Sequence, residues 1–136
     1  MSVLSSPRFL PSVLLADSAT GFLTGALQLG FTDALAQWCN LPAALLQGTG
    51  WFLLAYGLAA AYVGTRKPVP RGLVWMFVAG NLAWALACVA LLLGALVQPG
   101  PWGVAFVLLH VVTVSLMAEL QWFGLSRAPA ARLSTA

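Results

Sequence analysis

The chain has 136 residues, of which 61% are hydrophobic and only 7% are charged, and its mean hydropathy is +0.93. Soluble domains carry about a quarter charged residues, so this composition excludes a soluble fold and indicates an integral membrane protein. The net charge of +3 does not point to nucleic acid, because the basic residues lie outside the apolar segments and are better explained by orientation in the bilayer.

The first apolar segment, roughly residues 11–37, is predicted to form a transmembrane helix with one polar face. At about 100° per residue, Asp17, Thr24 and Gln28 fall on the same side of this helix. Lipid disfavours polar side chains, so this face should point into a bundle or toward a partner. These three residues are therefore candidates for binding or proton-linked roles.

Two other features bear on the same segment. Gly21 and Gly25 have the small-xxx-small spacing that lets helices pack closely, so we expect them to serve helix packing. Arg8 and the apolar residues after it also fit a signal peptide, but Pro11 interrupts that short run, and we expect the segment to be retained. A helix that begins only near Asp17 is the alternative.

Three further apolar segments follow, at roughly residues 43–64, 72–97 and 102–125. Between the four segments lie short breaks that contain proline, which cannot continue a helix: residues 40–42, 65–71 and 98–101. Backbone polar groups must be satisfied internally in hydrocarbon, so these breaks are predicted to be turns at the bilayer surface. The sequence thus predicts an all-α fold, a single transmembrane domain over residues 1–136 built as an up-and-down bundle of four transmembrane helices.

The positions of the basic residues predict the orientation of this bundle. With four spans, every Lys and Arg falls on one side of the membrane: Arg8, Arg66, Lys67, Arg71, Arg127 and Arg132. The two turns on the opposite side contain neither residue type. The positive-inside rule therefore places the N- and C-termini in the cytoplasm.

Two carboxylates lie within the predicted spans, and ionisable groups in a membrane are candidates for function. At 1.5 Å per residue, Asp17 lies about 8 to 9 Å inside the cytoplasmic end of its helix, and Glu119 lies about 9 Å inside its own. If the first and fourth helices are neighbours, the two groups could approach and share a proton-linked site. The alternative is that both reach water or nearby arginines by snorkelling.

Two more polar residues near the bilayer middle are candidates for binding. Asn81 shares a helix face with Trp84 and Cys88. His110 lies about 12 Å from the outer end of the fourth helix, where it could relay protons, bind haem or make one interhelical hydrogen bond. Haem usually needs a second axial ligand, and Met117 on the same helix face cannot supply the opposite position. We therefore expect no cofactor.

Sequence motifs that signal catalysis are absent. The chain contains no Cys-x-x-Cys or His-Glu-x-x-His metal spacing, no glycine-rich phosphate loop after a strand, and no Gly-x-Ser-x-Gly nucleophile turn. With three carboxylates and one histidine in total, it has few groups for acid-base chemistry. We expect a protein that is not an enzyme and has no metal site.

The strings LADSATGFLTGAL, LVWMFVAGNLAWALACVALLLGAL and LMAELQWFGLSR resemble those of small uncharacterised four-helix bacterial inner-membrane proteins, over most of the chain. The resemblance implies a location in the bacterial inner membrane, but no activity. Small multidrug-resistance transporters also have four short helices and a carboxylate in the first. This chain is longer, has Asp17 in place of glutamate and has a strong charge bias, so the likeness is only an analogy.

Two functions fit these observations. The first is a non-enzymatic accessory or binding subunit whose partners are the lipid bilayer, a lipophilic molecule, other membrane subunits or a second copy of the chain, and not nucleic acid. The alternative is an oligomeric proton-coupled transporter or channel for a small solute. In that case Asp17 and Glu119 would carry the protons, and Asn81 and His110 would line the path.

Overall fold

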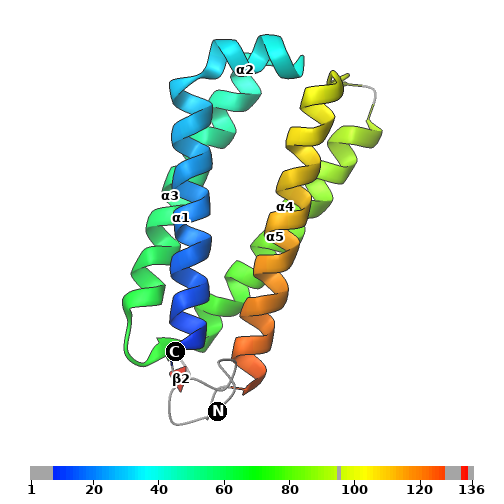
Figure 1. Cartoon of the computed structure of the whole chain (residues 1–136). Helices are drawn as coiled ribbons and strands as arrows, with labels where there is room; N and C mark the ends of the chain where they lie inside the picture. Colours follow the sequence, from blue (N-terminus) through cyan, green and yellow to red (C-terminus); the bar gives the residue numbers. More distant parts are fainter. Residues whose placement is uncertain (1–7, 95, 128–132, 135–136) are drawn as a thin grey trace.

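The computed structural model describes residues 8–94, 96–127 and 133–134, and it is an all-α bundle (Figure 1). The long helices are α1 (Phe9–Gly30), α3 (Ala43–Thr65), α4 (Arg71–Leu93) and α5 (Pro101–Arg127). Each of them is long and apolar enough to cross a membrane. The prediction of a bundle of four transmembrane helices is therefore confirmed, and the chain is a multi-pass membrane protein.

The first predicted segment is divided into two helices, so the prediction of one continuous helix over residues 11–37 was wrong. The chain leaves helical geometry at Phe31, with φ −126° and ψ 30°, and the short helix α2 (Thr32–Cys39) follows. Figure 1 shows α2 lying across one end of the bundle. Because α2 carries Asp33 and Gln37, a position at the membrane surface suits it better than the hydrocarbon.

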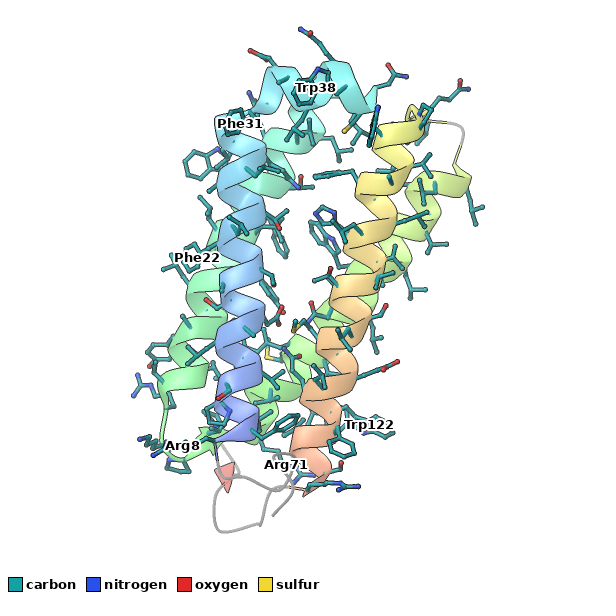
Figure 2. All side chains as sticks on the ribbon, in the orientation of Figure 1. Arg8, Phe22, Phe31, Trp38, Arg71 and Trp122 are labelled. Carbon is teal, nitrogen blue, oxygen red and sulfur yellow. The ribbon has the colours of Figure 1, made fainter. Side chains whose placement is uncertain are left out.

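The end of the bundle opposite α2, where α1 begins and α5 ends, is called the base here. A short parallel pair of strands, β1 (Val69–Pro70) and β2 (Leu133–Ser134), lies at this end. The basic residues that the structure describes also lie there: Arg8, Arg66, Lys67, Arg71 and Arg127, of which Figure 2 labels the first and fourth. The sixth, Arg132, is outside the described residues.

The four long helices pack as two pairs. α1 lies along α3, and α4 lies along α5, while the two pairs meet chiefly through α1 and α5. Figure 1 shows the pairs close together at the base and diverging toward α2. The helices are therefore not evenly spaced around one central axis, and the space between the pairs widens toward the middle of the bundle.

Glycines bring α1 and α3 into close contact. Gly21 and Gly25, the residues predicted to serve packing, both face α3. A Cβ added to Gly25 would lie 2.8 Å from the carbonyl oxygen of Gly50, and one added to Gly21 would lie 3.3 Å from that of Leu53. At Gly25 a side chain could be added only if one backbone shifted, and at Gly21 the neighbouring atoms would have to give by a few tenths of an ångström. These two glycines therefore allow the close approach of the two backbones.

The facing side of α3 has its own row of glycines, at Gly50, Gly57 and Gly64, seven residues apart. This spacing keeps all three on one helix face. The Ser18 hydroxyl of α1 donates a hydrogen bond of 2.7 Å to the carbonyl oxygen of Gly57. Close approach and this interhelical hydrogen bond make α1 and α3 a tightly joined pair.

Apolar clusters close the bundle at both ends. At the base, a buried cluster draws on all four long helices and β1: Leu10, Leu14, Val63, Val69, Val74, Val78, Ala118 and Leu125. At the other end, Cys39, Leu41 and Leu46 form a second cluster. There the backbone N–H of Gly100 donates to the carbonyl oxygen of Cys39 at 2.9 Å, which ties α2 to the start of α5. The middle of the bundle lies between these two packed ends.

Candidate functional site

A buried polar cluster joins all four long helices. Asp17 of α1 is only 3% exposed, and its Oδ2 atom accepts three hydrogen bonds from the other three helices. The donors are the Tyr56 hydroxyl of α3 at 2.6 Å, Asn81 Nδ2 of α4 at 3.0 Å and Gln121 Nε2 of α5 at 2.6 Å. We call these four residues the Asp17 cluster. It connects the two helix pairs through a single carboxylate oxygen.

The composition of the Asp17 cluster explains how a carboxylate is tolerated in the bundle interior. Burying an ionisable group is costly unless hydrogen bonds compensate it. Asn81 and Gln121 are themselves buried, and Asn81 Nδ2 also contacts Gln121 Oε1 at 3.4 Å. The cluster is thus a connected network of neutral donors around one acidic group. All three of these hydrogen bonds end on Oδ2, and none of them ends on Oδ1.

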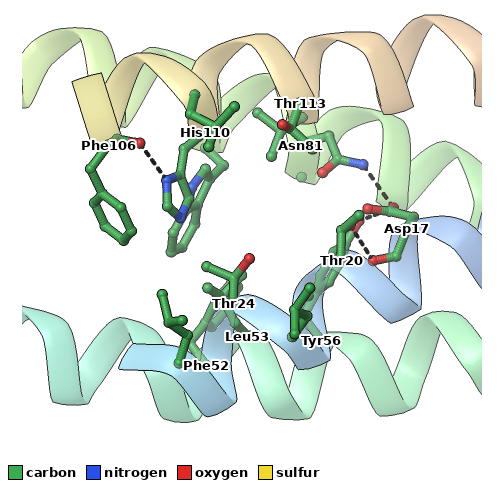
Figure 3. A pocket seen from close by; sticks show the side chains of 17 residues that line it. Asp17, Thr20, Thr24, Phe52, Leu53, Tyr56, Asn81, Phe106, His110 and Thr113 are labelled. Carbon is green, nitrogen blue, oxygen red and sulfur yellow. Dashed lines mark hydrogen bonds between the residues drawn. The ribbon is translucent and has the colours of Figure 1, made fainter. Parts of the chain in front are cut away.

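A cavity of about 370 Å³ extends from the Asp17 cluster toward α2, between the two helix pairs (Figure 3). Its volume is at the lower end of the range of about 300 to 1,000 Å³ that is common for small-molecule sites. Aromatic rings from three helices form much of its wall: Phe52, Tyr56, Trp84 and Phe106. The rings of Phe52 and Trp84 are stacked, with centroids 5.3 Å apart and planes 8° apart. The cavity is therefore mostly apolar, with a polar end at Asp17.

The rim of the cavity reaches the outer surface of the bundle. Leu23 of α1 and Leu109 of α5 both line the cavity, and their side chains are 72% and 64% exposed. Both residues lie well inside helices that are long enough to span a membrane. At that depth the surrounding medium is hydrocarbon rather than water. The cavity therefore opens sideways toward lipid.

His110 lies in the cavity wall, opposite Thr24 and Phe52 (Figure 3). Its Nδ1 is 2.8 Å from the carbonyl oxygen of Phe106. A carbonyl only accepts hydrogen bonds, so Nδ1 is the donor, and Nε2 is then the acceptor in a neutral ring. This Nε2 and the Trp84 Nε1 are buried without a hydrogen-bond partner in the described part of the chain. Both nitrogens are enclosed by the surrounding protein atoms.

The structure brings four of the six predicted binding residues to one place. Asp17, Thr24, Asn81 and His110 all line the cavity, and they come from α1, α4 and α5. Gln28 is buried one turn beyond Thr24, where its Oε1 accepts a hydrogen bond of 2.6 Å from the Thr49 hydroxyl. Gln28 therefore connects α1 to α3 rather than lining the cavity.

The sixth predicted residue, Glu119, does not meet Asp17. Glu119 is exposed on the outside of α5, whereas Gln121, two residues later, is fully buried and donates to Asp17. Positions two residues apart on a helix point about 200° apart, so only one of the two can face the bundle interior. The two carboxylates therefore do not share a site, which was one of the two possibilities considered, and the amide of Gln121 is the group of α5 that meets Asp17.

Two members of the Asp17 cluster were not predicted as site residues. Gln121 shares a helix face with His110, and that shared face is the signal that could have indicated it. Tyr56 lies in the middle of an apolar span, although tyrosine in membrane helices is enriched near the bilayer surface. A tyrosine at that depth needs a hydrogen-bond partner for its hydroxyl, which points to an acceptor on a neighbouring helix.

The described residues contain no group of three or more His, Cys, Asp or Glu side chains that could hold a metal ion. The fold and the site define a helical membrane protein with a cavity between two helix pairs. Comparison with protein-family models, with curated proteins and with solved structures gives no match to this chain.

Proposed function

We propose that this chain is a non-enzymatic protein of the bacterial inner membrane that binds a small lipophilic molecule in the cavity between its helix pairs. The observation that carries the proposal is the cavity itself, which is of ligand size, mostly apolar and placed at membrane depth. Binding sites for small molecules are concave and mainly apolar, with a few polar groups that fix the ligand's orientation. The Asp17 cluster supplies such groups at one end.

The lateral opening supports a ligand that comes from the bilayer. Leu23 and Leu109 at the rim are exposed where lipid surrounds the bundle, while the apolar clusters close both ends. A molecule dissolved in the hydrocarbon would therefore reach the cavity without crossing water. The same arrangement suits an accessory subunit that holds a lipophile for a larger membrane complex.

The orientation belongs to the proposal as well. The described basic residues lie at the base, which supports placing the base, and with it both chain termini, on the cytoplasmic side. The proton-coupled transport alternative has less support, because it needs Glu119 together with Asp17, Asn81 and His110, and Glu119 lies on the outside of α5 and does not line the cavity.

A saturable photolabel tests whether the cavity binds a lipophile. The full chain in lipid nanodiscs would be irradiated with a small neutral iodophenyl diazirine, and the labelled peptides would be mapped by mass spectrometry. Asn81 lines the cavity but is buried, so label at this residue reports on the cavity rather than on the lipid-facing surface. We expect the labelling of Asn81 to saturate as the probe concentration rises.

Two matched glycine substitutions make this test specific. Gly80 lines the cavity, and a Cβ there would have no heavy atom within 4 Å, so Gly80→Leu should fill open space and abolish the saturable label. Gly48 is equally open but does not line the cavity, so Gly48→Leu should leave the label unchanged. Labelling that does not saturate, or that is the same in both variants, would refute the proposal.

A further inference from the structure

The cavity carries charge of one sign only. Among the described residues that line it, Asp17 is the single carboxylate, and there is no Lys or Arg. The described basic residues lie at the base instead. As a carboxylate, Asp17 places a negative charge at the inner end of a largely apolar space, where electrostatic interactions are much stronger than in water.

The contacts of Asp17 do not cancel this charge. Its three hydrogen-bond partners are a phenol and two amides, which stabilise a carboxylate but bring no positive charge. Because these bonds all end on Oδ2 and the residue lines the cavity, Oδ1 is the oxygen that a group in the cavity can contact. A cation there would supply the positive charge that is absent from the described residues lining the cavity.

The walls of the cavity also favour a cation. Four aromatic side chains line it, and the face of an aromatic ring carries negative electrostatic potential. A cation held within about 6 Å of such a ring is attracted to it, most strongly when it is desolvated. The stacked pair of Phe52 and Trp84 also offers a flat apolar surface for the rest of the ligand. Aromatic walls and a carboxylate end therefore favour the same chemical class.

From this distribution of charge we infer that the ligand is a lipophilic organic cation, such as a tertiary or quaternary amine. Its charged nitrogen lies near Oδ1 of Asp17, and its apolar part packs against Phe52 and Trp84. The inference rests on the proposed function and specifies the ligand. An anionic lipophile of the same size is repelled by Asp17, and a neutral one gains nothing from the charge.

Competition against the diazirine label tests this assignment with two molecules of nearly the same shape. Benzyltrimethylammonium is a permanent cation, and neopentylbenzene is its neutral carbon isostere. Each would be titrated against the Asn81 label in the wild-type chain, in Asp17→Asn and in Glu119→Gln. Asp17→Asn removes the negative charge inside the cavity, and Glu119→Gln removes a negative charge from the outside of α5.

We expect benzyltrimethylammonium to protect the wild-type chain and Glu119→Gln at concentrations at least about tenfold lower than those needed for Asp17→Asn, because Asp17→Asn removes the attraction between the carboxylate and the permanent positive charge, which is strong in an apolar space. Neopentylbenzene should protect all three chains equally, which also shows that the cavity of Asp17→Asn is intact. Equal protection of wild type and Asp17→Asn by the cation would overturn the assignment. It would leave the proposed function standing, because that function is tested separately by the saturation of the label and by its loss in Gly80→Leu.

A measurement on the wild-type chain alone covers the case in which Asp17→Asn does not fold. Benzylsulfonate has a similar size and the opposite charge. Benzyltrimethylammonium should displace the label, and benzylsulfonate should not do so at tenfold higher concentration. Displacement by the anion at the same concentration as the cation would also overturn the assignment.

Discussion

At the scale of single residues, the molecule is organised around one carboxylate oxygen. Asp17 could be identified from the sequence because an acidic residue in an apolar span is rare and needs polar groups on neighbouring helices. Its partners could not be identified in the same way. The rotation of each helix and its position along the membrane normal decide which residues of α3, α4 and α5 reach Asp17. On α5, for example, Gln121 reaches Asp17, whereas Glu119, only two residues earlier, is exposed.

Removing one hydrogen bond from the Asp17 cluster should lower the stability of the bundle. Tyr56→Phe deletes the hydroxyl that donates to Asp17 at 2.6 Å and leaves the ring in place. We expect the free energy of unfolding to fall by about 1 to 2 kcal/mol, at the upper end for interhelical hydrogen bonds in membranes because the acceptor is a carboxyl group. Steric-trapping measurements of unfolding in bicelles would show this loss.

Tyr62→Phe is the matched control for that experiment. Tyr62 is exposed near the base, where the Arg66 guanidinium lies 4.0 Å from the centre of its ring. A phenylalanine ring keeps this contact, so the stability should change by less than about 0.5 kcal/mol. An equal loss in both variants would show that the Asp17 hydrogen bond contributes nothing specific.

At the scale of helices, the apolar segments could be recognised from the sequence because each is long, uncharged and bounded by proline or charge. The break at Phe31 could not, because the residues there include neither proline nor an interrupting charge pair. The polar residues of α2 were counted as the outer part of the first span, although they suit the membrane surface. The spacing of Gly21 and Gly25 predicts close packing of α1, but it does not show that the partner is the glycine face of α3.

Adding a single methyl group to the α1–α3 contact should be costly. In Gly25→Ala the new Cβ would meet the Gly50 carbonyl oxygen at 2.8 Å, so one of the two helices must shift. We expect a loss of about 1 to 3 kcal/mol in the free energy of unfolding, as is typical for overpacking. Gly48→Ala, with no atom within 4 Å of the new Cβ, should be neutral or stabilising by up to about 1 kcal/mol. If the two variants were equally stable, close helix packing would not be the role of Gly25.

The packing of α2 against the start of α5 gives a prediction about thiol chemistry. Burial raises the pKa of the Cys39 thiol, so less thiolate is present at neutral pH, and the rate of maleimide labelling should rise as pH increases. Both chains in this comparison carry Cys88→Ser. The first keeps Cys39, and the second has Cys39→Ser together with Gln37→Cys at an exposed position of the same helix. Cys39 should be labelled at least about tenfold more slowly than the cysteine at position 37. Equal rates would mean that α2 is not packed as described.

At the scale of the whole molecule, four helices could be predicted from composition and spacing, but their division into two pairs could not. The cavity lies between the closely packed α1–α3 pair and the α4–α5 pair, which diverges from it toward α2. Sequence patterns indicate which helix faces are polar, yet they carry no measure of the angle between two pairs. The cavity and its lateral opening therefore follow only from the three-dimensional arrangement.

The proposed orientation can be checked in cells. Because the described basic residues lie at the base, alkaline phosphatase fused after the last residue should stay in the cytoplasm and be inactive, while a fluorescent protein fused there should fluoresce. The phosphatase inserted in the turn between α4 and α5 should be active. An active phosphatase at the C-terminus would reverse the orientation.

Native mass spectrometry of the purified full chain tests the central claim, that the cavity holds a lipophilic ligand, most directly. After gentle extraction from its own membrane, wild type and Gly48→Leu should both carry a bound small molecule that dissociates on activation, whereas Gly80→Leu should appear at its bare mass because the new side chain occupies the cavity. Bare wild-type protein, or the same adduct on Gly80→Leu, would contradict the claim.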